Sequence, residues 1–140
     1  RIEAGFSLFC NEFSVGATAK ELGMSHFVDS TVEGPGDSMS LVCFSATAKQ
    51  KPVLWQRPPD ATVNLRQGEL LATSACFSAL AGSVLGLGYV VPGPIETMVS
   101  LVDPLGCFED ITLRPRPFFD PEKKSVLGGW DPQLNPMSSA

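Results

Sequence analysis

The sequence has few of the residues on which metal binding and nucleophilic catalysis depend. Its 140 residues include one histidine, His26, and four cysteines without any Cys-x-x-Cys pair. A closed zinc site needs Cys or His ligands at short spacings, and a Ser-His-Asp or Cys-His arrangement would have to use His26. His26 lies between Ser25 and Phe27 in a stretch with strand character, which favours a structural role. We therefore predict no metal site and neither a Ser-His-Asp nor a Cys-His arrangement in this chain.

Positive charge is also scarce. The chain has ten Lys and Arg residues and fifteen Asp and Glu residues, which gives a net charge of −5. A nucleic-acid-binding surface needs a surplus of basic residues, so the composition argues against a nucleic-acid partner. Hydrophobic residues make up 44% of the chain and charged residues 18%, which is typical of a packed globular domain rather than a disordered chain.

Signals for secretion or membrane insertion are weak. Residues 1–10 lack the basic leader, long apolar region and cleavage site of a signal peptide. The longest weakly polar run, residues 70–91, is about long enough to span a bilayer. Its Gly, Ser and Thr content and its β-branched end predict two buried strands instead. The cysteines fit buried, reduced thiols of an intracellular protein.

Residues 1–38 read as a short α/β segment. Thr18 and Glu21 have the spacing of a capping box, and Gly23 fits the position just after a helix C-terminus. These signals predict a helix of one or two turns, followed by a strand over residues 26–28. Residues 29–38 form an acidic stretch rich in Gly, Pro and Ser, which indicates a boundary between two structural units.

Residues 39–121 follow an all-β pattern. Short apolar or alternating stretches are separated by turns rich in Pro and Gly, which is typical of a small barrel or sandwich. The interior glycines of residues 84–91 suggest a bulge, a barrel bend or a close backbone approach. Residues 122–140 have little periodicity and read as an extended tail. The expected strands are residues 40–45, 52–56, 62–65, 68–75, 84–91, 97–103 and 108–119.

The first residues fit part of a known motif. Arg1, Glu3, Ala4 and Gly5 match an R-x-E-A-G segment, and residues 18–22 stand where a T-P-x-E-A/G-x-L pattern follows it. A longer stretch, Thr73–Val90, matches a T-S-G-x-x-S-P stretch that ends in G-Y-V some residues later. The positions that agree in this stretch are Thr73, Ser74, Ser78, Gly88, Tyr89 and Val90.

Two further features follow in the same order. Gly68 matches a glycine turn before the long stretch, and the last strand runs into Pro117 and Phe118. Together, over roughly residues 1–121, the chain resembles the glycine cleavage system T-protein (aminomethyltransferase) family. The resemblance implies a three-part fold around a central folate site. In this interpretation residues 1–38 end the folate-binding-type domain, whose earlier part is absent, and residues 39–121 form the C-terminal antiparallel β-barrel.

The resemblance also implies a function. Members of the family transfer a one-carbon unit to tetrahydrofolate from an aminomethyl group on a lipoyl-carrying partner protein, and they release ammonia. The aspartate that assists the chemistry would lie in the missing N-terminal part, on the same chain or on a second one, so this chain alone is not expected to be an enzyme. A mitochondrial location is expected from the family, with no membrane association.

Glu3 is the predicted cofactor-binding residue. A pterin ring presents an N–H and an amino group side by side, and a carboxylate can accept both as a bidentate pair. By resemblance Glu3 takes this role; the alternative is that it pairs with Arg1 or is exposed. Tyr89 and Trp55 could supply aromatic surface to the ligand, although packing within a strand is the favoured alternative for Tyr89.

Several departures from the family pattern favour a second hypothesis. Residues 29–37 are acidic where the family carries a basic cluster, and residues 103–106 replace a basic turn with Asp-Pro-Leu-Gly. Ala75 and Ala79 replace a glycine and a proline of the long motif. The second hypothesis is therefore a non-catalytic structural or regulatory subunit of a mitochondrial assembly that keeps the T-protein fold. A third is an unrelated small barrel that binds protein partners.

Overall fold

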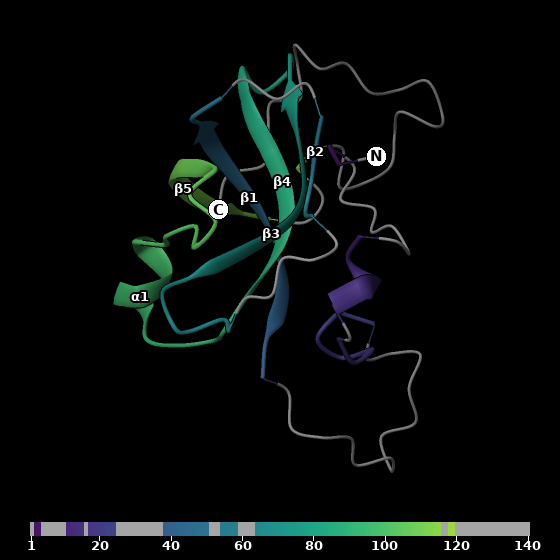
Figure 1. Cartoon of the computed structure of the whole chain (residues 1–140), viewed down its shortest axis with the longest axis vertical. Helices are drawn as coiled ribbons and strands as arrows, with labels where there is room; N and C mark the ends of the chain where they lie inside the picture. Colours follow the sequence, from purple (N-terminus) through teal and green to yellow (C-terminus); the bar gives the residue numbers. More distant parts are fainter. Residues whose placement is uncertain are drawn as a thin grey trace.

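The chain forms one antiparallel sheet of five strands (Figure 1). We analysed a computed structural model, which describes residues 2–3, 11–15, 17–24, 38–50, 54–58, 64–115 and 118–119. The strand order is β2-β3-β4-β1-β5, so β1 lies beside β4 instead of beside β2, which is a Greek-key order. The elements are η1 (Phe13–Val15, a 3-10 helix), β1 (Ser40–Ala48), β2 (Leu54–Gln56), β3 (Leu70–Ser78), β4 (Ser83–Val90), α1 (Ile95–Val99) and β5 (Phe108–Arg114).

The prediction of a mainly β, antiparallel fold is confirmed, but the prediction of a closed barrel is wrong for the described residues. β2 and β5 form the two edges of the sheet and do not pair with each other. β2 has only three residues, and β5 is bulged where Asp110 takes a φ of 53°. Short or strongly bent edge strands cannot supply the continuous ladder that closure requires.

One predicted strand is absent. Residues 97–103 alternate in hydrophobicity, but residues 95–99 form the short helix α1. Pro94 stands at its N-cap, and its carbonyl accepts hydrogen bonds from the backbone N–H and the hydroxyl of Thr97, at 3.0 and 2.7 Å. Proline is favoured at the start of a helix. Its fixed φ suits the backbone there, and an N–H at that position would have no acceptor within the helix. Only Val102 joins the sheet, through an isolated parallel bridge to Glu69.

The other expected strands fall near their predicted places where the structure describes them. The apolar run of residues 70–91 folds as the hairpin of β3 and β4, and none of the described residues belongs to a helix long and apolar enough to cross a membrane. Residues 64–65 lie in no strand. The predicted strand at residues 26–28 and the tail at residues 122–140 lie outside the described residues.

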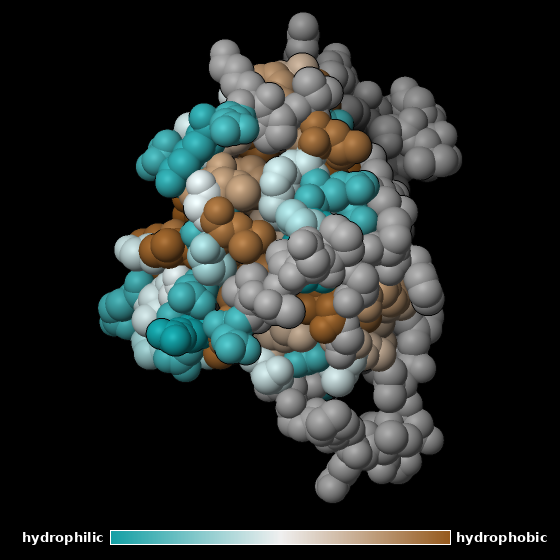
Figure 2. Space-filling model, in the orientation of Figure 1, coloured by the Kyte–Doolittle hydropathy of each residue, from teal (hydrophilic) through white to brown (hydrophobic). Residues whose placement is uncertain are grey.

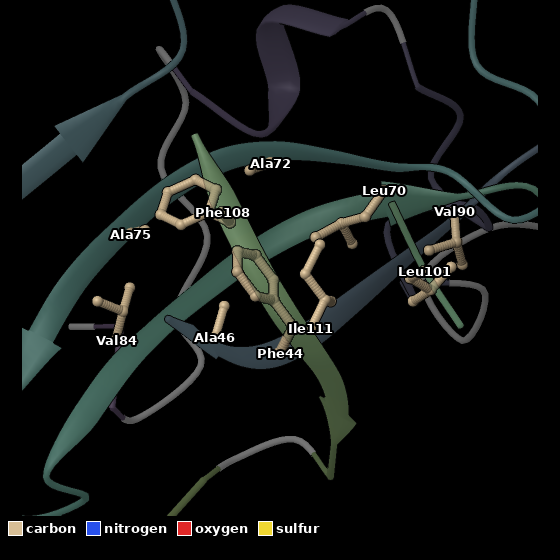
Figure 3. Close-up of a cluster of buried hydrophobic side chains, with 10 residues drawn as sticks. All are labelled: Phe44, Ala46, Leu70, Ala72, Ala75, Val84, Val90, Leu101, Phe108 and Ile111. Carbon is tan, nitrogen blue, oxygen red and sulfur yellow. The ribbon is translucent and has the colours of Figure 1, made fainter. Parts of the chain in front are cut away.

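β4 is buried on both faces, and the first face carries the larger hydrophobic cluster. Phe44 and Phe108 meet edge to face there at 5.7 Å between ring centroids, and Trp55 meets Phe108 at 5.3 Å. Figure 3 shows the buried members of this first cluster, which come from β1, β3, β4 and β5 and from Leu101. The buried members of this first cluster are Phe44, Ala46, Leu70, Ala72, Ala75, Val84, Val90, Leu101, Phe108 and Ile111.

The second face is covered by residues that lie far apart in the sequence. Ile2, Phe118 and Phe119 pack together over β1 and β4, and Leu22 packs against Tyr89 nearby. Figure 1 shows η1 and residues 17–24, in purple, on one side of the sheet and α1 on the other. The second face therefore depends for its burial on an N-terminal segment, defined here as residues 2–3, 11–15 and 17–24.

Some large hydrophobic side chains of the described residues stay exposed at the surface. Figure 2 shows hydrophobic residues interleaved with hydrophilic ones on the face in view. Single exposed hydrophobic residues are normal for a globular protein. The exposed ones among the described residues are Leu54, Phe77, Leu80, Ile95, Val99 and Val102.

Two glycines of β4 mark close approaches, as the sequence suggested. A Cβ atom on Gly86 would meet the Phe44 ring at 2.3 Å and the carbonyl oxygen of Ser74 at 2.9 Å. A Cβ atom on Gly88 would meet the carbonyl oxygen of Leu71 at 2.6 Å, beside a bulge in β3. Neither position leaves room for a side chain.

We expect Gly86→Ala to lower the free energy of unfolding by about 1–3 kcal/mol, because the added methyl overpacks the space under Phe44. Urea denaturation would measure the loss. In the double variant Gly86→Ala with Phe44→Leu, the smaller side chain should relieve part of the clash, so the loss should be less than the sum of the two single losses. Strictly additive losses would contradict the assigned contact.

Candidate functional site

Glu3, the predicted pterin carboxylate, is attached to the end of β3. The hydroxyl of Ser78 donates a hydrogen bond to its Oε1 at 2.5 Å. Glu3 is half-buried, and its neighbour Ile2 is buried in the second face. Ser78 is buried as well, and its oxygen accepts the N–H of Ala81 in the hairpin after β3. Glu3 is thus held in place by a buried neighbour and by a buried hydroxyl, while Arg1 lies outside the described residues.

Glu12 is a buried acid that sequence reasoning missed. Its side chain is fully buried, and its Oε1 accepts hydrogen bonds from the hydroxyls of Thr73, at 2.9 Å, and Ser74, at 2.5 Å. Thr73 and Ser74 had been noted only as part of the family motif. The one signal in the sequence was a glutamate within the mostly apolar stretch of residues 8–15. A buried carboxylate is strongly destabilising unless donors satisfy it, so the two hydroxyls are needed.

A β-bulge explains how two consecutive residues reach one oxygen. Ala72 pairs with Gly88 and Ser74 pairs with Leu87, so Thr73 is an extra residue in β3. In a regular strand, the side chains of Thr73 and Ser74 would point to opposite faces. A bulge inserts a residue and turns a side chain toward a new direction. Both hydroxyls therefore face Glu12.

Tyr89, the second predicted ligand residue, is fully buried in the second face. Its hydroxyl donates to the backbone carbonyl of Glu12 at 2.9 Å, and its ring packs with Leu22 and Leu71. Trp55 packs into the first cluster, on the opposite face of the sheet. The structure therefore does not bring these two aromatic residues together, and it gives Tyr89 a role in packing and in holding Glu12. A contact of Tyr89 with a ligand stays a prediction.

Glu21 confirms the predicted capping box. Its carboxylate accepts the N–H of Thr18 at 2.8 Å, and the Thr18 hydroxyl oxygen accepts the N–H of Glu21 at 3.2 Å. The N–H of Met24 bonds to the carbonyl of Ala19 and that of Gly23 to the carbonyl of Lys20, with Gly23 at a φ of 72°. This is a Schellman motif, so the predicted helix is a single closed turn.

Glu21 also fixes this turn to the start of β1. Its carboxylate accepts the N–H groups of Ser38 and Met39, at 2.8 and 3.0 Å, and the Ser38 hydroxyl at 3.2 Å. Burial alone would raise the pKa of Glu21. The hydrogen bonds from Thr18, Ser38 and Met39 outweigh that effect and lower the pKa from 4.5 to about 2. Glu21 is therefore a structural carboxylate.

Asp103 has a similar structural role in the turn before β5. Its carboxylate accepts the N–H groups of Leu105, Cys107 and Phe108, at 2.6 to 3.0 Å, and its carbonyl accepts that of Gly106. Burial, and then the nearby charge of Asp103, raise the pKa of the Cys107 thiol. Asp103 thus serves to order the turn before β5.

The described residues include no group of three or more His, Cys, Asp or Glu side chains that could hold a metal ion. Cys43 is buried, and Cys76 and Cys107 are half-buried. His26 and Cys10 lie outside the described part of the chain.

Comparisons with protein-family models, with curated proteins and with solved structures found no match for the chain. The resemblance to the T-protein family stays a prediction from the residues quoted above.

The lowered pKa of Glu21 predicts an acid-sensitive contribution to stability. Because the folded-state pKa lies below the ordinary value, the contribution is present above about pH 4.5 and is lost as the pH falls toward 2. A pKa difference of this size corresponds to about 3 kcal/mol. The free energy of unfolding, measured by urea denaturation, should thus fall more steeply between about pH 5 and pH 2 for the wild type than for Glu21→Gln.

A matched control is Glu96→Gln, which removes an exposed acid from the first turn of α1. This variant should keep the wild-type pH dependence. If Glu21→Gln and Glu96→Gln follow the same pH dependence, the hydrogen bonds to Glu21 do not stabilise the fold in the way described.

Proposed function

We propose that the chain is the C-terminal part of an aminomethyltransferase (T-protein)-like protein and that it supplies one wall of a tetrahydrofolate site. In this proposal Glu3 accepts the adjacent N–H and amino group of the pterin. The catalytic aspartate belongs to the part of the protein that precedes this chain, on the same or a second polypeptide. The one-carbon donor is an aminomethyl group on a lipoyl-carrying protein, and the family resemblance suggests mitochondria as the location.

The observation that carries the proposal is the difference between Glu3 and the other inward-facing acids. Glu12 accepts two hydroxyl hydrogen bonds and is fully buried. Glu21 accepts four hydrogen bonds and Asp103 accepts three through their carboxylates. Within the described part of the chain, the Glu3 carboxylate accepts one, from Ser78, and Glu3 stays half-buried.

This difference leaves acceptor capacity on Glu3. A carboxylate has about four lone-pair positions for hydrogen-bond donors. The bond from Ser78 uses one of them and fixes the direction of the carboxylate. A carboxylate already held in one orientation loses less conformational freedom when it binds a planar pair of donors. Glu3, which accepts one bond and stays half-buried, therefore suits a bidentate contact with a pterin better than the three buried acids do.

A second candidate function is a non-catalytic structural subunit with the T-protein fold. The use of Glu12, Glu21 and Asp103 within the fold favours it, because these acids order the chain rather than face a ligand. By the family resemblance, the sequence also has acidic residues within 29–37 and at Asp103 at positions where a cation would meet the anionic tail of the cofactor. In this case Glu3 and Ser78 would serve only to attach the N-terminal segment.

Titration calorimetry of the intact protein with 5-formyltetrahydrofolate distinguishes the two candidates. If the first is correct, the wild type binds, and Glu3→Gln weakens binding by about 1.5–3 kcal/mol, because the amide replaces an acceptor with a donor toward the pterin. Glu96→Gln, which removes the same charge from an exposed site, should keep the wild-type affinity.

Two results would reject the tetrahydrofolate site. The first is the absence of both binding heat and thermal shift at millimolar ligand, which would favour the structural subunit. The second is binding that Glu3→Gln leaves unchanged, which would remove Glu3 from the site.

A further inference from the structure

The N-terminal segment is attached to β3 at two points on one face. Glu3 bonds to Ser78, and Glu12 bonds to Thr73 and Ser74. Ser74 and Ser78 are four residues apart, so both side chains lie on the same face of the strand, about 13 Å from each other. Cys76, between them, packs with the second-face cluster. β3 therefore fixes the spacing between the two acids.

Contacts of Glu12 extend to two neighbouring strands. Its carboxylate lies on the bulge of β3, and its backbone carbonyl accepts the Tyr89 hydroxyl from β4. Ser74 pairs with Leu87 across these two strands. We call Glu12, Thr73, Ser74 and Tyr89 the carboxylate clasp. All four are buried, so the clasp is shielded from competing water.

The carboxylate clasp defines the register of the N-terminal segment on the sheet more strictly than hydrophobic packing alone would. The hydrophobic effect has no direction, whereas a buried carboxylate must meet its hydrogen-bond donors in a defined geometry. The bulge at Thr73 presents two hydroxyls to one oxygen, and no regular strand pair would do so. These contacts favour the register in which Glu12 meets Thr73 and Ser74 and Glu3 meets Ser78.

We infer that Glu12 is a positioning residue, which docks the N-terminal segment on the bulge of β3 and thereby holds Glu3 in its orientation at Ser78. The ligand-related part of this inference rests on the proposed function, because it takes Glu3 as the pterin carboxylate. The docking part rests only on the contacts of the clasp.

The test compares two double variants of the full chain. Thr73→Val with Ser74→Ala removes both hydroxyl donors and keeps similar side-chain volumes. Thr73→Ser with Ser74→Thr exchanges the two side chains and keeps both hydroxyls, so it serves as the matched control. Single Ser74→Ala removes one donor and provides a milder variant if the first double variant does not fold.

Amide hydrogen exchange is the first readout. In the donor-free variant, or in Ser74→Ala, amides of residues 11–15 should exchange about tenfold faster or more, while amides at the centre of β1 and β4 keep their protection. The hydroxyl-exchanged control should resemble the wild type. Unchanged protection of residues 11–15 would overturn the inference, and so would an equal loss of protection throughout the sheet.

Affinity for 5-formyltetrahydrofolate is the second readout. If the wild type binds, the donor-free variant should bind about tenfold more weakly and the control should bind normally, although neither variant alters Glu3. Suppose that the amides of residues 11–15 exchange faster in a variant, but that this variant binds 5-formyltetrahydrofolate with normal affinity. This result would overturn the positioning role of Glu12. If the wild type does not bind, the proposed function fails, and the exchange result still decides whether the clasp docks the segment.

Discussion

The hydrogen bonds from Thr73 and Ser74 to the buried carboxylate of Glu12 are the interaction on which the second face of the sheet depends. Without donors, a carboxylate in this apolar environment would destabilise the fold by several kcal/mol. With them, the N-terminal segment can cover Leu87 and Tyr89 and leave β4 buried on both faces. The bulge in β3 is therefore needed for this packing, because it directs the hydroxyls of Thr73 and Ser74 to the same carboxylate.

The same contacts explain how acidic residues are used in this chain. Glu12, Glu21 and Asp103 each tie a segment without regular strand structure to the sheet or to its turns, and the hydrogen bonds described above come from hydroxyls and backbone N–H groups. This use of acids agrees with the scarcity of Lys and Arg in the sequence. Glu3 differs because it keeps partial exposure and accepts a single bond from the described residues, which is why the functional proposal centres on it.

Local signals in the sequence predicted the local structure well. The Thr18 and Glu21 spacing predicted the capping box, and a close backbone approach was one of three alternatives predicted for the interior glycines of β4. The errors arose where distant partners decide the outcome. Residues 97–103 alternate like a strand, but Pro94 starts a helical turn, and barrel closure depends on edges that sequence patterns do not describe. Glu12 was missed because its partners lie about sixty residues away on a bulge that only the pairing of β3 with β4 creates.

A double-mutant cycle between Glu12→Gln and Ser74→Ala tests the central claim most directly, because it isolates the energy of the contact itself. Free energies of unfolding of the wild type, both single variants and the double variant give the coupling energy. The account predicts that each single variant is destabilised and that the two residues are coupled by about 1–3 kcal/mol. A coupling energy near zero would show that the two side chains do not interact and would contradict the account.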